Sequence, residues 1–390
     1  MTCVVISACN VASYAQGGGH FWVYMQYAQG LRRLGVDVLW LEKISQVGDG
    51  HADEGGLETF YQRMDQYGLG GKTILYVSDQ STEETRYEFL NVSYSEARRL
   101  LRGADLLLNF QYDMNPSLLE WFARTALVDI DPGLLQFWIS TGQLSVRPHD
   151  VYFTIGETVG TAAARFSDCG LSWMHISPPI CLDLWPYSFD PDCRAFTTVS
   201  HWLTRDWIRD ESGLWENTKR VSFMEFLRLP QLTNQQLELA LNLEKADEDR
   251  RNLERNGWRV RDASQVVGSP EKYQSYIRGS RGEFSCAKPS CMRFENAWVS
   301  DRSICYMASG KPVVVQNTGP SSYLPNNEGL YRFTTMEEAL AAFEAINSDY
   351  ERNCRAAREI AESLFDSRPI LEGLLNTALE KGVEPPSSGC

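Results

Sequence analysis

Short apolar segments alternate with segments of helical spacing along the first half of this chain. Residues 20–34 and 83–101 have the apolar spacing of helices. The apolar runs between turn residues are typical of buried strands: TCVVISA, VDVLWL, KTILYV, ADLLLNF, ALVDID and DVYFTIG. Regular alternation of this kind predicts an α/β protein whose parallel sheets are covered on both faces by helices.

The alternation stops at the proline-rich stretch PPICLDLWPYSFDPDC, residues 178–193, which we interpret as a linker. Beyond it we expect strands at AFTTVS, TKRVSFMEF and KPVVVQ, and helices at residues 234–243 (with a charged continuation to 255), 336–346 and 350–364. The chain is therefore predicted to form two Rossmann-like lobes, residues 1–185 and 186–382. We expect their parallel sheets to face a cleft between the lobes, and residues 383–390 to be a disordered tail.

Composition narrows the class of protein. The chain has 390 residues, of which 43% are hydrophobic and 23% charged, as in a soluble protein of two domains. A net charge of -14, with no run of Lys or Arg, opposes a nucleic-acid partner. The sequence has no leader-like segment and no bilayer-length apolar run, so we expect a cytoplasmic protein without stable membrane insertion. Its ten cysteines are irregularly spaced, which favours reduced thiols over a zinc site.

A glycine-rich turn, Gly17 to His20, follows the first predicted strand. The dinucleotide-binding fingerprint requires a third glycine where Trp22 stands, although Glu42 imitates its ribose-binding acid. Two interpretations remain: the glycines only permit a tight turn, or Gly18 and Gly19 let a ligand approach the backbone, with His20 facing the cleft.

A second candidate site lies at a predicted helix start in the second lobe. Ser300 is a good N-cap, Asp301, Arg302 and Ser303 form the first turn, and Gly310 ends the helix. The free N–H groups of a helix start favour a diphosphate, to which Lys288 or Arg302 would add charged donors. The alternative for Arg302 is an exposed residue paired with Asp301.

Several motifs in both halves resemble one family. The stretch MASGKPVVVQNTG, which ends in Thr318 and Gly319, resembles the MA-x-G-x-PVV signature in the donor-binding domain of GT-B glycosyltransferases. Six further stretches resemble a poorly characterised bacterial branch of group 1 glycosyltransferases: SRGEFSCAK, WVSDRS, EGLYRF, GGGHFWVYMQYAQGLRRLGVDVLWLE, DIDPG with QFW, and YFTIGE. The resemblance implies a two-lobed enzyme whose C-terminal lobe holds a nucleotide-sugar, with UDP, dTDP or GDP as its nucleotide. Thr318 and Gly319 are counted with that donor site.

The chain departs from this family at one pair of positions. Many relatives carry two glutamates eight residues apart, the second of which holds the ribose, and here those positions are Ala297 and Cys305. Glu283 or Glu295 would have to substitute. Retaining chemistry, which is associated with that glutamate pair, is correspondingly less supported.

Acidic residues at predicted strand ends are further candidates. Asp129 and Asp131 imitate the Asp-x-Asp metal site of the other large glycosyltransferase fold, but we interpret Asp129 as structural and expect no metal. Asp131 would orient an acceptor or act as a base, with helix capping as its alternative. Glu157 would contact acceptor hydroxyls or partner His20, with N-capping as its alternative.

These features predict a metal-independent glycosyltransferase with a small-molecule acceptor, such as a secondary metabolite, while a glycan or peptide stays open. An inverting displacement with His20 as base is favoured, followed by Asp131 and Glu157. The alternatives are a nucleotide-sugar 2-epimerase of the same fold and a non-catalytic nucleotide-sugar binding protein. A nicotinamide dehydrogenase is opposed by Trp22. The oligomeric state is left open.

Overall fold

The computed structural model describes residues 1–44, 54–79, 86–202 and 207–380. It divides into two compact units. The first comprises Met1–Thr161, Phe166–Cys181 and the segment that begins at Ser367; the second comprises Ala162–Arg165 and Leu182–Asp366. The main division lies between Cys181 and Leu182, and the segment from Ser367 belongs to the first unit, whereas the sequence analysis places it in the second lobe. The predicted tail at 383–390 lies outside the described residues.

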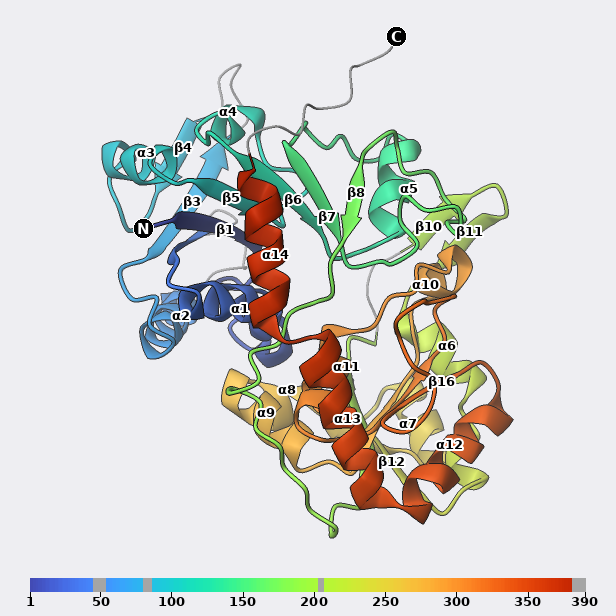
Figure 1. The fold of residues 1–390 in the computed structure, drawn as a ribbon. Coiled ribbons are helices and arrows are strands. Elements are labelled where there is room, and N and C mark those ends of the chain that lie inside the picture. Colours follow the sequence, from blue (N-terminus) through green and yellow to red (C-terminus); the bar gives the residue numbers. More distant parts are fainter. Residues whose placement is uncertain (45–53, 80–85, 203–206, 381–390) are drawn as a thin grey trace. The chain divides into compact units, whose positions relative to one another are not determined.

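An eight-stranded sheet forms the centre of the first unit, in the order β4-β3-β2-β1-β5-β6-β7-β8 (Figure 1). Neighbouring strands are parallel, except that β4 runs antiparallel to β3, so the sheet is mixed. Its central strand β1 is fully buried at Val4, Val5 and Ile6 because helices cover both faces. The strands are β1 (Cys3–Cys9), β2 (Asp37–Lys43), β3 (Thr73–Asp79), β4 (Arg86–Phe89), β5 (Leu106–Asn109), β6 (Thr125–Asp129), β7 (Val151–Thr154) and β8 (Trp173–His175).

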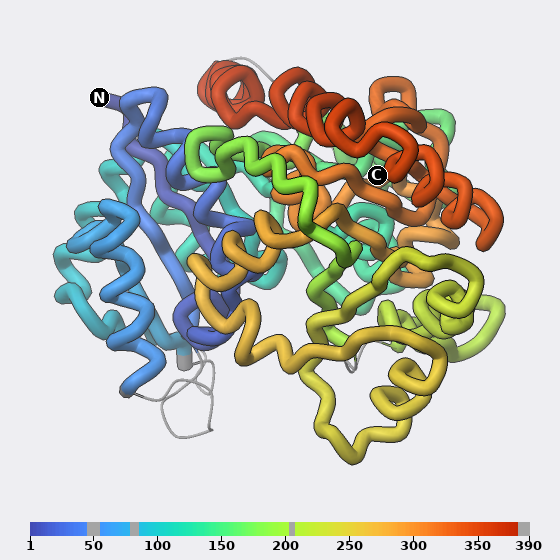
Figure 2. Tube along the Cα trace, turned by 90° about the horizontal axis from the view of Figure 1, so that it is seen from below, coloured from blue at the N-terminus to red at the C-terminus, as the bar shows by residue number. Residues whose placement is uncertain are grey.

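The helices of this unit are α1 (Gly18–Arg33), α2 (Glu54–Gln66), α3 (Tyr94–Arg102), α4 (Pro116–Leu119), α5 (Leu134–Ser140) and α14 (Ser367–Leu379). The last of them packs against α1, so the red end of the chain lies beside its blue start (Figure 2). Gly30 permits this approach, because a Cβ there would lie 2.3 Å from Leu371 Cδ1. The helix predicted over 83–101 is wrong at 86–89, which form β4, and residues 83–85 lie outside the described part.

A six-stranded parallel sheet forms the centre of the second unit, in the order β13-β12-β9-β14-β15-β16. Its strands are β9 (Ala195–Ser200), β12 (Gln236–Leu241), β13 (Arg259–Asp262), β14 (Gly282–Ser285), β15 (Val313–Gln316) and β16 (Leu330–Phe333). A separate antiparallel pair consists of β10 (Trp207–Asp210) and β11 (Gly213–Glu216). The helices are α6 (Lys219–Glu225), α7 (Glu248–Arg255), α8 (Ala263–Val267), α9 (Pro270–Arg278), α10 (Pro289–Phe294), α11 (Asp301–Ala308), α12 (Met336–Ser348) and α13 (Tyr350–Leu364), with a short 3-10 turn η1 (Leu229–Gln231).

Two predictions in this unit are wrong. The run TKRVSFMEF, expected as a strand, forms the helix α6, because helical spacing brings Phe223 and Phe226 into one aromatic core. Residues 236–241, expected within a helix, form the strand β12. Burial of Leu237, Leu239 and Leu241 in that core overrides the helix propensity of their leucine-rich segment.

Within the described residues, no helix is both long and apolar enough to cross a membrane.

Candidate functional site

A small polar pocket lies at the carboxyl ends of β14 and β15, beside the N-terminus of α11. Ligands of open α/β sheets bind at this edge. Its volume of about 20 Å³ holds little more than one water molecule. Its lining residues are Lys219, Ser285, Cys286, Ala287, Trp298, Val299, Ser300, Arg302, Ser303, Val315, Gln316 and Thr318.

Helix α11 begins where the sequence predicts. Ser300 is its N-cap, with φ −65° and ψ 137°, and Gly310 follows its end with φ 71°. Within the described residues the Ser300 side chain makes no capping hydrogen bond. The N–H groups of the first turn therefore lack the side-chain acceptor that an N-cap serine usually supplies. A helix start of this kind favours an anion.

Arg302 is one of the residues that line this pocket, which we call the donor-side pocket after the role predicted for its residues. Arg302 is only 8% exposed, so the alternative that it is an exposed residue paired with Asp301 is wrong. Its guanidinium donates from Nε to Glu283 Oε1 at 2.5 Å, from Nη1 to Val199 O at 2.9 Å and from Nη2 to Ser285 Oγ at 2.6 Å. Three bonds inside the protein fix the position of this cation; its contact with a diphosphate stays a prediction.

Glu283 and Glu295, the two candidates to replace the ribose-binding glutamate, differ in their surroundings. Glu283 is fully buried on β14 and paired with Arg302, so its carboxylate is not presented to a ribose. Glu295 caps α10 in the left-handed region, with φ 47°. The carbonyl oxygen of Glu295 lies close to Gly319, where an added Cβ would be only 2.5 Å from it. Together with the φ of 130° at Gly319, this contact requires a glycine at that position.

The remaining donor-side candidates divide between the pocket and its surroundings. Thr318 lines the pocket and donates from Oγ1 to the carbonyl of Trp298 at 2.7 Å. Ser303 lines it as well, almost completely buried. Lys288 is the N-cap of α10, and neither it nor Asp301 is a lining residue.

Lys219 is a lining residue that the sequence analysis missed. It is the first residue of α6, and its Nζ lies 5.9 Å from the centre of the Trp298 ring. Burial, together with the charge of Arg302, lowers the pKa of Lys219 to about 7. The mistaken strand at this segment concealed it; a lone lysine at a helix start carries no other signal.

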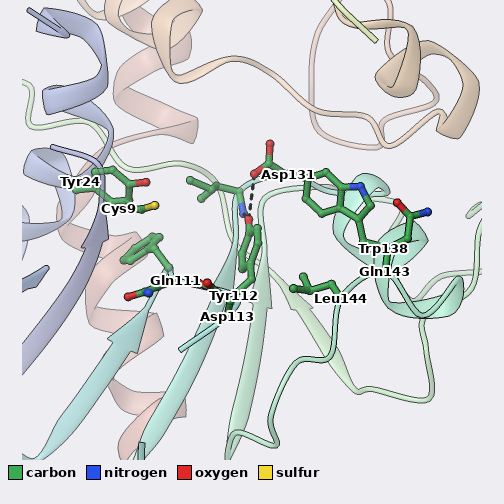
Figure 3. A pocket seen from close by; sticks show the side chains of 11 residues that line it. Cys9, Tyr24, Gln111, Tyr112, Asp113, Asp131, Trp138, Gln143 and Leu144 are labelled. Atoms are coloured by element: carbon green, nitrogen blue, oxygen red, sulfur yellow. Dashed lines mark hydrogen bonds between the residues drawn. The ribbon is translucent and has the colours of Figure 1, made fainter. Parts of the chain in front are cut away.

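A larger pocket belongs to the first unit, at the carboxyl ends of β1, β5 and β6 (Figure 3). Its volume of about 440 Å³ is within the usual range for small-molecule sites. The residues that line it are Cys9, Tyr24, Phe110, Gln111, Tyr112, Asp113, Ile130, Asp131, Trp138, Gln143 and Leu144. We call it the ring pocket, after its aromatic walls.

Asp129 and Asp131 differ in their surroundings. Asp129 is fully buried and accepts hydrogen bonds from Gln136 Nε2, Thr154 Oγ1 and the Asp131 N–H, each at 2.9 Å. Burial raises the pKa of Asp129 to about 7. Asp131 is half-buried at the ring pocket, where the Tyr112 hydroxyl donates to its Oδ2 at 3.2 Å (Figure 3). Among the residues that the structure describes, no group of three or more His, Cys, Asp or Glu side chains is placed to hold a metal ion.

His20 lies in the first turn of α1, next to the wall of the ring pocket. Its Nε2 is 2.7 Å from the carbonyl oxygen of Cys9, so Nε2 carries a proton. Its ring packs edge-on against Tyr24 with 5.4 Å between centroids. Both of these partners line the ring pocket, although His20 itself is not a lining residue.

The glycine turn has a local structural explanation, and Glu157 lies in a turn. A Cβ on Gly17 would lie 2.2 Å from the Tyr14 ring, while Gly18 and Gly19 open helix α1. Glu157 follows β7 in a turn, and the N-capping alternative for it is wrong because no helix begins there in the described part of the chain. Its charge opposes the lowering of the His175 pKa by burial.

Glu42, which imitates a ribose-binding acid, is fully buried. It accepts hydrogen bonds from the Ala12 N–H at 2.7 Å and from Trp40 Nε1 at 2.9 Å. With Trp22 also buried, the dinucleotide interpretation of this turn loses its remaining support.

Comparison with solved structures identifies the fold. An α-glucosyltransferase in complex with UDP and a 13-mer DNA aligns over 97% of this chain and 99% of its own, with a TM-score of 0.61 and 11% identity. Anabaena HepE in complex with UDP and glucose gives 0.57 at 11% identity, and sucrose-phosphate synthase from Thermosynechococcus elongatus 0.54 at 13%, both with coverage of 97% and 99%. These neighbours are GT-B glycosyltransferases, and the chain has their α/β fold, as predicted. In sequence, it matches neither a family model nor a curated protein.

Proposed function

We propose that this protein is a glycosyltransferase that uses a uridine-diphosphate sugar and a small-molecule acceptor. One observation carries the proposal: within a GT-B fold, a helix start and a half-buried lysine share one pocket at the carboxyl ends of β14 and β15. The neighbours that share this fold bind UDP, which favours uridine among the nucleotides considered.

On the donor side, the diphosphate would lie over the N-terminus of α11. Lys219 would supply the charge, and Ser300, Ser303 and Thr318 line the same pocket. Arg302, held in place by its three hydrogen bonds, would add a fixed positive charge beside the diphosphate. Charge that develops on the leaving diphosphate would be stabilised by donors already in place, which is the usual source of the largest catalytic effect.

On the acceptor side, the ring pocket would hold the molecule that receives the sugar. Asp131, fixed by Tyr112, lines that pocket, while His20 lies behind its wall against Cys9 and Tyr24. We propose His20 as the base of an inverting displacement, followed by Asp131 and then Glu157. His20 would need to move by a side-chain rotation to reach the acceptor hydroxyl.

A thermal-shift panel of UDP, GDP, dTDP and ADP tests the donor assignment. We expect UDP to raise Tm most, because a ligand that binds only the folded state stabilises it. Lys219→Met should remove most of that shift, while Lys272→Met, on the exposed face of α9, should keep it. Equal shifts in both variants would contradict the assignment.

Product analysis separates the catalytic alternatives. A transferase consumes a UDP-sugar faster when acceptor is added. A 2-epimerase would interconvert UDP-sugars without acceptor, and a binding protein would leave them intact. Either of the last two results would overturn the proposal.

A further inference from the structure

The ring pocket has an unusual charge distribution for a sugar-transfer site. Two carboxylates, Asp113 and Asp131, line it, and its lining contains no Lys, Arg or His. Asp113 is exposed and makes no hydrogen bond or ion pair with any residue in the described part of the chain. Asp131 is held by the Tyr112 hydroxyl. A bound cation would therefore meet two negative groups without a competing positive charge.

The body of the pocket is apolar and flat-sided. Tyr24, Phe110 and Trp138 contribute aromatic rings to its lining, and Ile130 and Leu144 add aliphatic surface. Tyr24 and Trp138 are labelled in Figure 3. Tyr24 and Phe110 are fixed against each other, edge-on, with 5.4 Å between centroids. Aromatic walls of this kind bind a ring, and they also attract a cation near their faces.

Gln111 adds a hydrogen-bond donor to the pocket lining. It lines the pocket, is 6% exposed, and its Oε1 accepts from the Tyr76 hydroxyl at 3.3 Å. Its Nε2 has no hydrogen-bond partner among the residues that the structure describes. This amide nitrogen is a donor that no acceptor in the described part of the chain uses, and an oxygen on the ligand would accept from it.

We infer that the acceptor is a small ring-containing molecule that carries a protonated amine and a hydroxyl. The amine would lie between Asp113 and Asp131, the ring between the aromatic walls, and the hydroxyl oxygen near Gln111. This inference rests on the proposed function, since it specifies that enzyme's acceptor. Anionic acceptors, nucleic acid included, would meet two like charges in the pocket.

Three probes of the same shape test the charge preference: 2-phenylethylamine, 2-phenylethanol and phenylacetate, titrated at neutral pH and followed by the tryptophan fluorescence of the full chain. We expect the amine to bind about fivefold more tightly than the alcohol, and phenylacetate to bind more weakly than both. Phenylacetate binding as tightly as the amine, or no saturable binding of any probe, would overturn the inference.

Substitutions locate the effect. Asp113→Asn should weaken amine binding about fivefold while binding of the alcohol stays the same. Asp192→Asn, at a side chain 90% exposed in the second unit, should change neither. Equal losses for amine and alcohol in Asp113→Asn would contradict the inference. UDP binding, measured in parallel, separates the outcomes: amine preference without UDP binding defeats only the proposed function, and UDP binding without amine preference only this inference.

Discussion

Arg302 and Glu283 form an ion pair inside the second unit, with Arg302 Nε 2.5 Å from Glu283 Oε1. Their side chains are 9% and 0% exposed. The pair connects the first turn of α11 to strand β14, the two elements whose ends border the donor-side pocket. It therefore positions the helix start that we propose as the diphosphate site.

Breaking this pair is expected to destabilise the protein strongly. Arg302→Met leaves the Glu283 carboxylate buried without its partner, at a cost of about 3–5 kcal/mol. Urea unfolding measures the change. Arg352→Met is the matched control: Arg352 pairs with Glu328, at 66% and 44% exposure, and its loss should cost about 1 kcal/mol or less. Similar losses in the two variants would show that burial of the first pair has no effect.

Lys219 should link UDP binding to pH. Its pKa of about 7 leaves it largely neutral above that pH, and a bound diphosphate would favour the charged form. Binding should then take up a proton, and UDP affinity should fall between pH 7.5 and 9. Calorimetry in two buffers of different ionisation enthalpy measures the uptake. Lys219→Met should abolish it and weaken UDP binding about tenfold or more; an unchanged proton uptake would assign it to another group.

The catalytic base is decided by comparing two variants. If His20 is the base, His20→Ala should reduce kcat by about 10²-fold or more and leave UDP binding intact. Asp131→Asn should then act mainly on acceptor KM. Steady-state kinetics with both substrates varied separates these effects. Wild-type turnover in His20→Ala, with a large kcat loss in Asp131→Asn, would transfer the role to Asp131.

Asp129 should make stability depend on pH. Burial raises its pKa to about 7 from an ordinary value near 3.8, so between these values the folded state holds a proton that the unfolded state has released. Its stabilising contribution is complete below pH 4 and is lost as pH rises through 7. The Tm of the wild type should therefore fall relative to the Tm of Asp129→Asn between pH 5 and pH 8. A difference independent of pH would mean that Asp129 is ionised throughout.

Local sequence patterns predict most elements of this fold because they depend on neighbouring residues. The apolar runs give six of the eight strands of the first sheet, and Ser300 with Gly310 marks both ends of α11. The missed strands, β4 and β8, have exposed or half-buried positions and lack the apolar run. At α6 and β12 the choice of helix or strand depends on contacts in the aromatic core, which no short window contains.

The sequence indicates which kinds of residue belong to the candidate site, but it does not show which of them lie together. A helix start, a signature strand and acids at strand ends are visible in the sequence, and the structure brings Ser300, Arg302, Ser303 and Thr318 to one pocket. Lys219 lies more than eighty residues before them in the chain and joins them only through the order of strands.

By itself, the sequence determined the α/β class and the helix start at Ser300. These features follow from periodicity and capping, which act over a few residues. Only the tertiary structure decided that the last helix returns to the first unit, that Arg302 is paired with Glu283, and that Asp113, Asp131 and Gln111 share one aromatic pocket. Those relationships depend on packing between distant segments, where the burial of each group determines its partners and charge.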